Sequence, residues 1–92
     1  MYSMKFENHK QAQAQVNYYG DGSYALQSYS TIVAEVDAEG WLHVNGLYSM
    51  TTIKHLGWFA KMLGTSYQTL KQLLQDEKDM NIFTGEVRDW IE

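Results

Sequence analysis

The sequence of 92 residues contains neither cysteine nor proline. The absence of cysteine excludes disulfides, thiolate-bound zinc sites and cysteine nucleophiles. The absence of proline excludes the stiff linkers that proline-rich segments form between domains. A chain of this length supplies a single hydrophobic core, so we expect one small globular domain over residues 1–92. Residues 1–10 and 88–92 are expected to be loosely held ends of that domain.

Long hydrophobic runs are also missing. The N-terminal segment MYSMKFENHKQAQAQ lacks the apolar stretch of a secretory signal, and no apolar run approaches the ~20 residues that span a bilayer. Hydrophobic residues make up 45% and charged residues 20% of the chain, which is typical of a compact fold rather than a disordered tail. We therefore expect a protein that stays out of the membrane and works in a reducing cytoplasm.

Basic residues are few, with seven lysines and arginines against eleven acids and a net charge of −4. Their distribution is uneven. Residues 40–75 contain no acid at all, yet they include Lys54, Lys61 and Lys71, whereas residues 76–92 are acidic again. A mildly basic segment inside an acidic chain can mark a binding face, although so few charges also fall this way by chance.

Three segments in the first half of the chain favour β-structure. Residues 11–19, 23–36 and 41–48 alternate or are rich in β-branched and aromatic residues. Glycine-containing turns separate them at residues 20–22 and 37–40. The second segment is long enough that we expect a bend or bulge near residues 28–30. Together these segments predict a three-stranded antiparallel meander.

Two helices are predicted to follow. Residues 49–64 carry apolar residues at helical spacing, with Ser49 or Thr51 as the cap and Gly64 just beyond the end. A second helix is expected to start at a capping box made by Thr65 and Gln68, and to end around residue 78. The predicted fold class is therefore α+β, a three-stranded antiparallel meander followed by a two-helix hairpin packed on one face.

Residues 59–74, FAKMLGTSYQTLKQLL, partly resemble a helix-turn-helix. Such motifs need a small residue in the first helix, a glycine at the turn and apolar residues on the buried side of the second helix. The exposed residues expected to contact duplex DNA are Lys54, Lys61, Ser66, Gln68, Lys71 and Gln72. Residues 40–75 contain no arginine and only three lysines, however, so simple packing or protein contact is the stronger alternative.

A second resemblance rests on the stretches SYSTIVAEV and LYSMTTIKHLGWF, with the spaced pattern Y-S-x-T-T-x-x-H from Tyr48 to His55. This pattern is similar to small uncharacterised accessory proteins of phages and prophages. The resemblance implies the cytoplasm of a bacterial host as the setting. It also implies a role as a regulator of transcription or as an inhibitor of host enzymes, including anti-CRISPR proteins.

The alternative to DNA binding is docking on a host protein such as a nuclease. The chain has seven tyrosines and three tryptophans, residue types that are enriched at protein interfaces. The residues expected at such an interface are Tyr18, Tyr19, Tyr24, Tyr29, Asp76, Glu77 and Asp79. Pairing of open sheet edges into a homodimer is a further hypothesis.

The serines and histidines of the sequence show no pattern of enzymatic chemistry. No nucleophile elbow accompanies the serines, and His9, His43 and His55 do not have the spacing of a metal motif. His55 is interpreted as a hydrogen-bonded structural residue. We therefore expect a non-enzymatic binding protein with no metal and no cofactor.

Overall fold

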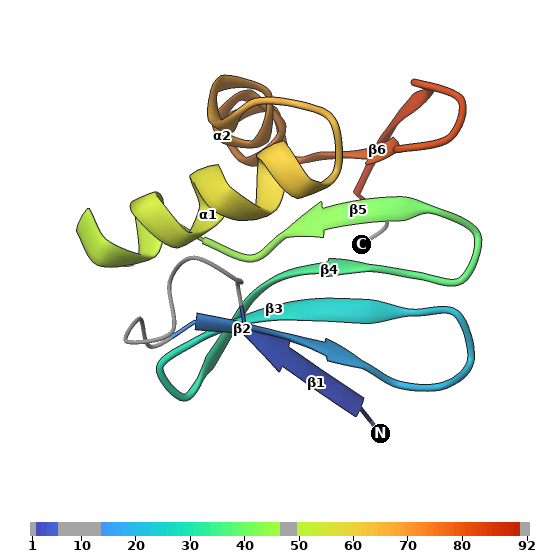
Figure 1. The fold of residues 1–92 in the computed structure, drawn as a ribbon. Coiled ribbons are helices and arrows are strands. Elements are labelled where there is room, and N and C mark those ends of the chain that lie inside the picture. Colours follow the sequence, from blue (N-terminus) through green and yellow to red (C-terminus); the bar gives the residue numbers. More distant parts are fainter. Residues whose placement is uncertain (1, 6–13, 47–49, 91–92) are drawn as a thin grey trace.

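The computed structural model describes residues 2–5, 14–46 and 50–90 of the chain. In this part, seven strands form one antiparallel sheet in their chain order, and two helices are inserted between the fifth and sixth strands (Figure 1). The α+β class expected from the sequence is confirmed. The elements are β1 (Tyr2–Lys5), β2 (Ala14–Tyr18), β3 (Tyr24–Ser28), β4 (Thr31–Val36), β5 (Trp41–Val44), α1 (Met50–Met62), α2 (Tyr67–Asp76), β6 (Lys78–Asn81) and β7 (Val87–Asp89).

The segment 23–36 is a hairpin, not the single bent strand that its sequence predicts. β3 and β4 pair antiparallel, with Ser28 opposite Thr31, and the chain reverses between them at Tyr29 and Ser30. Tyr29 has a φ of 56°, the left-handed conformation that tight hairpin turns require. Because this turn contains no glycine or asparagine, the reversal left no recognisable signal in the sequence.

Three further strands enlarge the predicted three-stranded meander. β1 pairs with β2 at one edge of the sheet, while β6 pairs with β5 and β7 pairs with β6 at the other edge. Residues 2–5 and 88–89, which we expected in loosely held ends, are therefore parts of edge strands. These strands are four, four and three residues long, too short for alternation to be recognised in the sequence.

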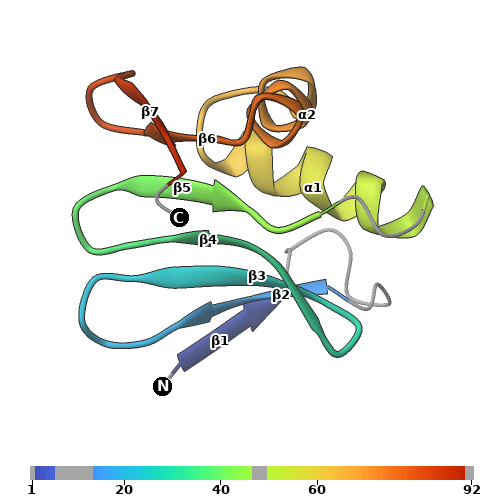
Figure 2. The same cartoon turned by 180° about the vertical axis from the view of Figure 1, so that it is seen from behind.

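One face of the sheet carries the hydrophobic core. Val16, Leu26, Ala34 and Val44 lie opposite one another across β2 to β5, and all four are buried. The helices cover this row, with α1 against β3 and β4, and α2 against β5 and β6 (Figures 1 and 2). They contribute Leu56, Phe59, Ala60, Leu70 and Leu73 to the core. Each fully buried leucine side chain stabilises the fold by roughly 1.5–3 kcal/mol relative to exposure.

The ends of the helices differ in detail from the expected ones. α1 starts at Met50, so Thr51 lies inside the helix, and Ser49 lies outside the described residues. The predicted cap of α2 by Thr65 is wrong, because Ser66 Oγ accepts the hydrogen bond from the Thr69 N–H at 3.3 Å. Gly64 has a φ of 81°, as its place after α1 predicted. Neither of these described helices is long and apolar enough to cross a membrane.

The β6–β7 hairpin is held against the β4–β5 turn. Asn81 Nδ2 donates to the Glu39 carbonyl at 3.0 Å, and the Ile82 N–H donates to the Gly40 carbonyl at 2.8 Å. Gly40 is buried with a φ of 94°, and a Cβ atom there would lie 2.5 Å from Phe83 Cδ2. This position therefore requires glycine both for its backbone conformation and for the space beneath the Phe83 ring.

We predict that Gly40→Ala lowers the free energy of unfolding by more than about 1 kcal/mol, because the new methyl group adds backbone strain and a steric clash. The matched control is Gly57→Ala in α1, where a Cβ atom would meet nothing within 4 Å. This control is expected to raise stability by up to about 1 kcal/mol, since alanine favours the helix. Urea denaturation of both variants measures the difference, and equal midpoints would contradict the prediction.

Candidate functional site

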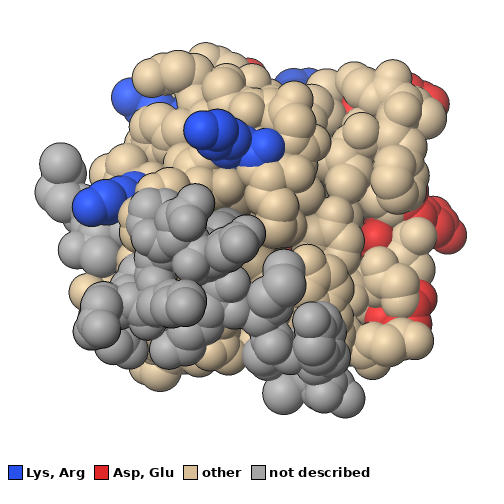
Figure 3. All heavy atoms as spheres, viewed as in Figure 1, with Lys and Arg blue, Asp and Glu red and all other residues tan. Residues whose placement is uncertain are grey.

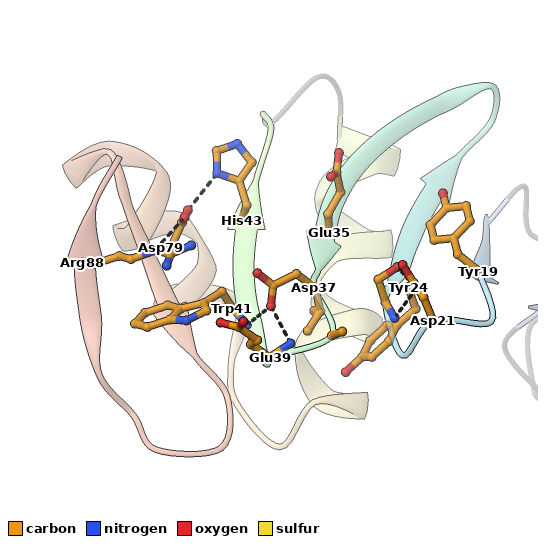
Figure 4. A pocket seen from close by; sticks show the side chains of 13 residues that line it. Tyr19, Asp21, Tyr24, Glu35, Asp37, Glu39, Trp41, His43, Asp79 and Arg88 are labelled. Atoms are coloured by element: carbon orange, nitrogen blue, oxygen red, sulfur yellow. Dashed lines mark hydrogen bonds and ion pairs between the residues drawn. The ribbon is translucent and has the colours of Figure 1, made fainter. Parts of the chain in front are cut away.

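A hollow of about 570 Å³ opens where the β2–β3 and β4–β5 turns meet the sheet (Figure 4). It extends from these turns over β4, β5, β6 and β7, largely on the face turned away from the helices. We call it the acidic hollow. Its lining residues are Tyr19, Asp21, Ser23, Tyr24, Glu35, Val36, Asp37, Ala38, Glu39, Trp41, His43, Asp79 and Arg88.

Strand alternation places the central side chains of the acidic hollow. Glu35 lies opposite His43 across β4 and β5, and Asp79 lies opposite Arg88 across β6 and β7. Trp41 is two residues before His43 on β5 and therefore shares its face. The neighbours of Glu35 and His43 along β4 and β5 are buried in the core. Burial of this apolar row therefore forces the polar side chains of β4 and β5 outward.

Negative charge dominates the acidic hollow. Five carboxylates line it, those of Asp21, Glu35, Asp37, Glu39 and Asp79, against one arginine and one histidine. Figure 3 shows Asp and Glu side chains at the end of the molecule where the turns lie, and lysines on the side that carries the helices. Closely spaced carboxylates of one sign attract cationic groups.

Asp79 holds both basic groups of the lining. Its Oδ1 lies 2.8 Å from His43 Nδ1, and its Oδ2 lies 3.6 Å from Arg88 Nε, while its side chain is only 13% exposed. The Arg88 guanidinium also lies 4.0 Å above the Trp41 ring centre, a cation–π contact. One edge of the acidic hollow thus shows a guanidinium seated between an aromatic ring and a carboxylate.

Two other carboxylates stabilise the turns. Asp37 Oδ1 accepts hydrogen bonds from the Glu39 and Trp41 N–H groups, both at 2.9 Å. Asp21 accepts hydrogen bonds from the Ser23 hydroxyl and, at 2.8 Å, from the Ser23 N–H. The hydroxyl bond, followed by the backbone bond, lowers the pKa of Asp21. Glu35 and Glu39 are exposed and leave their charge available to a ligand.

A model of the Family of unknown function (DUF8033) matches residues 3–79. The chain belongs to this family. The match runs from β1 into β6, and it includes every lining residue of the acidic hollow except Arg88. Neither the curated proteins nor the solved structures contained a match to the chain. Because the description of DUF8033 states no function, the function is inferred from the geometry of this member.

In this DUF8033 member, the residues expected to contact DNA are divided between the two helices. Lys54 and Lys61 are exposed on α1, and the other four expected contacts are the cap residue Ser66 and three residues of α2. The two helices run in different directions: Figure 1 shows α2 nearly end-on, while α1 crosses the view. Lys71 is half-buried. Gln72 Nε2 donates to Asp76 Oδ2 at 3.0 Å, which brings a negative charge to this surface of α2.

The residues expected at a protein interface are also separated. Tyr19, Tyr24 and Asp79 line the acidic hollow, and Tyr18 packs on Tyr24 with ring centres 5.5 Å apart. The remaining three lie elsewhere, Tyr29 at the β3–β4 turn, Asp76 at the end of α2 and Glu77 in its left-handed cap. Asp79 sits in β6, and its side chain is largely covered.

Several lining residues were not recognised in the sequence. The lining residues of the acidic hollow that were not among the expected interface residues include Glu35, Asp37, Glu39, Trp41, His43 and Arg88. The alternation of Trp41-Leu42-His43-Val44 does indicate that Trp41 and His43 share a polar face. Nothing in the sequence pairs that face with β6 and β7. No group of three or more potential metal-ligating side chains converges among the described residues.

We predict that Tyr24 ionises above the ordinary pKa of 10.0, because burial, and then repulsion from Tyr18, raises the pKa of its phenol. The folded state favours the protonated phenol of Tyr24. Its contribution to the free energy of unfolding is therefore complete below pH 10 and is lost as the pH rises through the folded-state pKa. Absorbance titration of the tyrosines, compared with Tyr24→Phe, measures the effect. If the wild type and Tyr24→Phe show the same titration above pH 10, the prediction is contradicted.

Proposed function

We propose that this protein acts by binding, and that the acidic hollow docks a basic segment of a partner protein. The observation that carries the proposal is the seat of Arg88 between Trp41 and Asp79. This arrangement supports docking in which an arginine or lysine of the partner contacts an aromatic ring and a carboxylate elsewhere in the acidic hollow. Glu35 and Glu39 supply the negative charge there, and Tyr19 adds an aromatic surface that is 42% exposed.

A host nuclease fits the chemistry of such a partner. Proteins that bind nucleic acid carry basic surfaces, and an acidic hollow of this kind competes with phosphate for them. Aromatic residues at the same place supply the anchoring contacts that protein interfaces favour. The resemblance of two sequence segments to phage accessory proteins supports the same role, that of an anti-defence inhibitor or adaptor, as in anti-CRISPR proteins.

The test uses a short peptide of alternating arginine and serine, with a glutamate-for-arginine peptide as its negative counterpart. We expect the wild-type protein to bind the arginine peptide, with NMR shifts confined to the acidic hollow, and more weakly as salt rises. Glu35→Lys should weaken binding by about tenfold, because it places like charges together. Glu86→Lys is the matched control, an exposed acid outside the acidic hollow. Equal weakening by both variants would refute docking at this site.

Duplex DNA bound by the helical hairpin is the second candidate function. It is supported by the exposure of Lys54, Lys61 and Gln68 on helices that carry no acid before Asp76. Binding of this kind depends on phosphate contacts and falls with salt.

Titration with a pool of labelled duplexes tests this candidate. We expect binding at low salt that decreases at moderate salt and is lost in Lys71→Glu with Gln68→Ala. Lys78→Glu is the control of equal charge change, because Lys78 lies in β6 and pairs with Asp89 at 2.7 Å. Retained binding in the helix variant, or no binding of the wild type at low salt, excludes the hairpin as a reader of DNA.

A further inference from the structure

The end of β3 and the middle of α1 meet in space, outside the lining of the acidic hollow. Ser28 ends β3 and His55 lies in α1, and Ser28 Oγ is 2.7 Å from His55 Nδ1. Both residues are almost fully buried, as expected for a structural histidine. The His55 ring in turn lies between two other rings, 6.0 Å from the centre of Tyr29 and 5.1 Å from the centre of Trp58. The buried Ser28–His55 pair thus fixes an aromatic row, formed by Tyr29, His55 and Trp58, across the β3–β4 turn and α1.

Tyr29 is strained and exposed at the same time. Its φ of 56° is unfavourable for a side chain with a Cβ atom, yet 55% of the residue faces solvent. The turn is held in place by Gln27 Nε2, which donates to the Tyr29 carbonyl at 2.8 Å. Glycine would adopt this conformation without strain. An exposed aromatic ring held in a strained turn indicates a functional requirement for the ring.

Lysines flank this aromatic row. Lys54, Trp58 and Lys61 are spaced four and three residues apart on α1, which places them on one stripe of the helix. Lys54 Nζ lies 5.6 Å from the centre of the Trp58 ring. α1 contains no acid, and the Asp and Glu side chains in Figure 3 gather at the opposite end of the molecule. These residues differ from the DNA contacts expected for a helix-turn-helix, because none of them lies at the start of α2.

We propose that Tyr29, Trp58, Lys54 and Lys61 form a face that binds single-stranded nucleic acid. An unstacked base lies on the exposed Tyr29 ring, Trp58 holds Lys54 beside it, and phosphates pair with the two lysines. Stacking on protein rings requires bases that are free of a duplex, which is why the aromatic content favours a single strand. The cations match the charge of the backbone, and the binding does not depend on the base sequence because every base offers a flat face.

The experiment measures fluorescence anisotropy of labelled thymidine and uridine oligonucleotides of about 12 residues, from low to moderate salt. Wild-type protein is expected to bind one or both, and a preference identifies the sugar. Tyr29→Gly should weaken binding by about tenfold, the scale of one lost stacking contact. Its melting temperature should not fall, because glycine relieves the strain at this turn. Lys54→Glu should weaken binding and reduce its dependence on salt.

Lys78→Glu is the matched control, since Lys78 lies in β6 outside the proposed face and pairs with Asp89 at 2.7 Å. It should bind single strands as the wild type does. The proposal is overturned if the wild type fails to bind at low salt, or if Tyr29→Gly binds as tightly as the wild type. It is equally overturned if the protein prefers duplex to single strands and Lys71→Glu abolishes duplex binding. That result would assign the nucleic-acid contact to the helical hairpin. Binding of peptides by the acidic hollow is measured separately and stands or fails independently.

Discussion

Burial of one sheet face beneath α1 and α2 is the constraint on which the rest of the structure depends. Side chains alternate along a strand, so placing Leu26, Ala34 and Val44 in the core fixes the opposite direction for their neighbours. A slip of one residue would bring Glu35 and His43 under the helices, where their charge and polarity are not tolerated. The hydrophobic contacts of one face therefore organise the polar chemistry of the other.

The same arrangement separates charge across the molecule. The acidic hollow lies at the turns of one end, while Lys54 and Lys61 lie on α1, on the side that carries the helices. The molecule extends 35 × 30 × 24 Å, whereas salt screens exposed charges beyond about 8 Å at physiological ionic strength. The two faces therefore act on their surroundings independently despite the net charge of −4. The proposed binding of a basic protein segment and that of an anionic strand therefore use different sides of the molecule.

Local signals predicted some elements well and others not at all. Gly64 marked the end of α1, and the apolar stripe of Leu56, Phe59 and Leu63 identified its buried side. The turn at Tyr29 was missed because a residue with a large side chain occupies a conformation that usually needs glycine or asparagine. The short edge strands were missed because three or four residues show too little alternation. Ser66 caps α2 with its side chain, whereas the Thr65 N–H closes the end of α1 on the Ala60 carbonyl.

What the sequence determined by itself is local: the α+β class, the two helices with their glycine break, and the alternation that sets Trp41 and His43 on one face. These features depend on residues close together in the chain, where propensity and periodicity act. The tertiary structure alone decided that His43 meets Asp79, 36 residues away, and that Ser28 meets His55, 27 residues away. Such contacts depend on strand register and on where the helices return the chain to the sheet, which are properties of the whole packed core and not of any short segment.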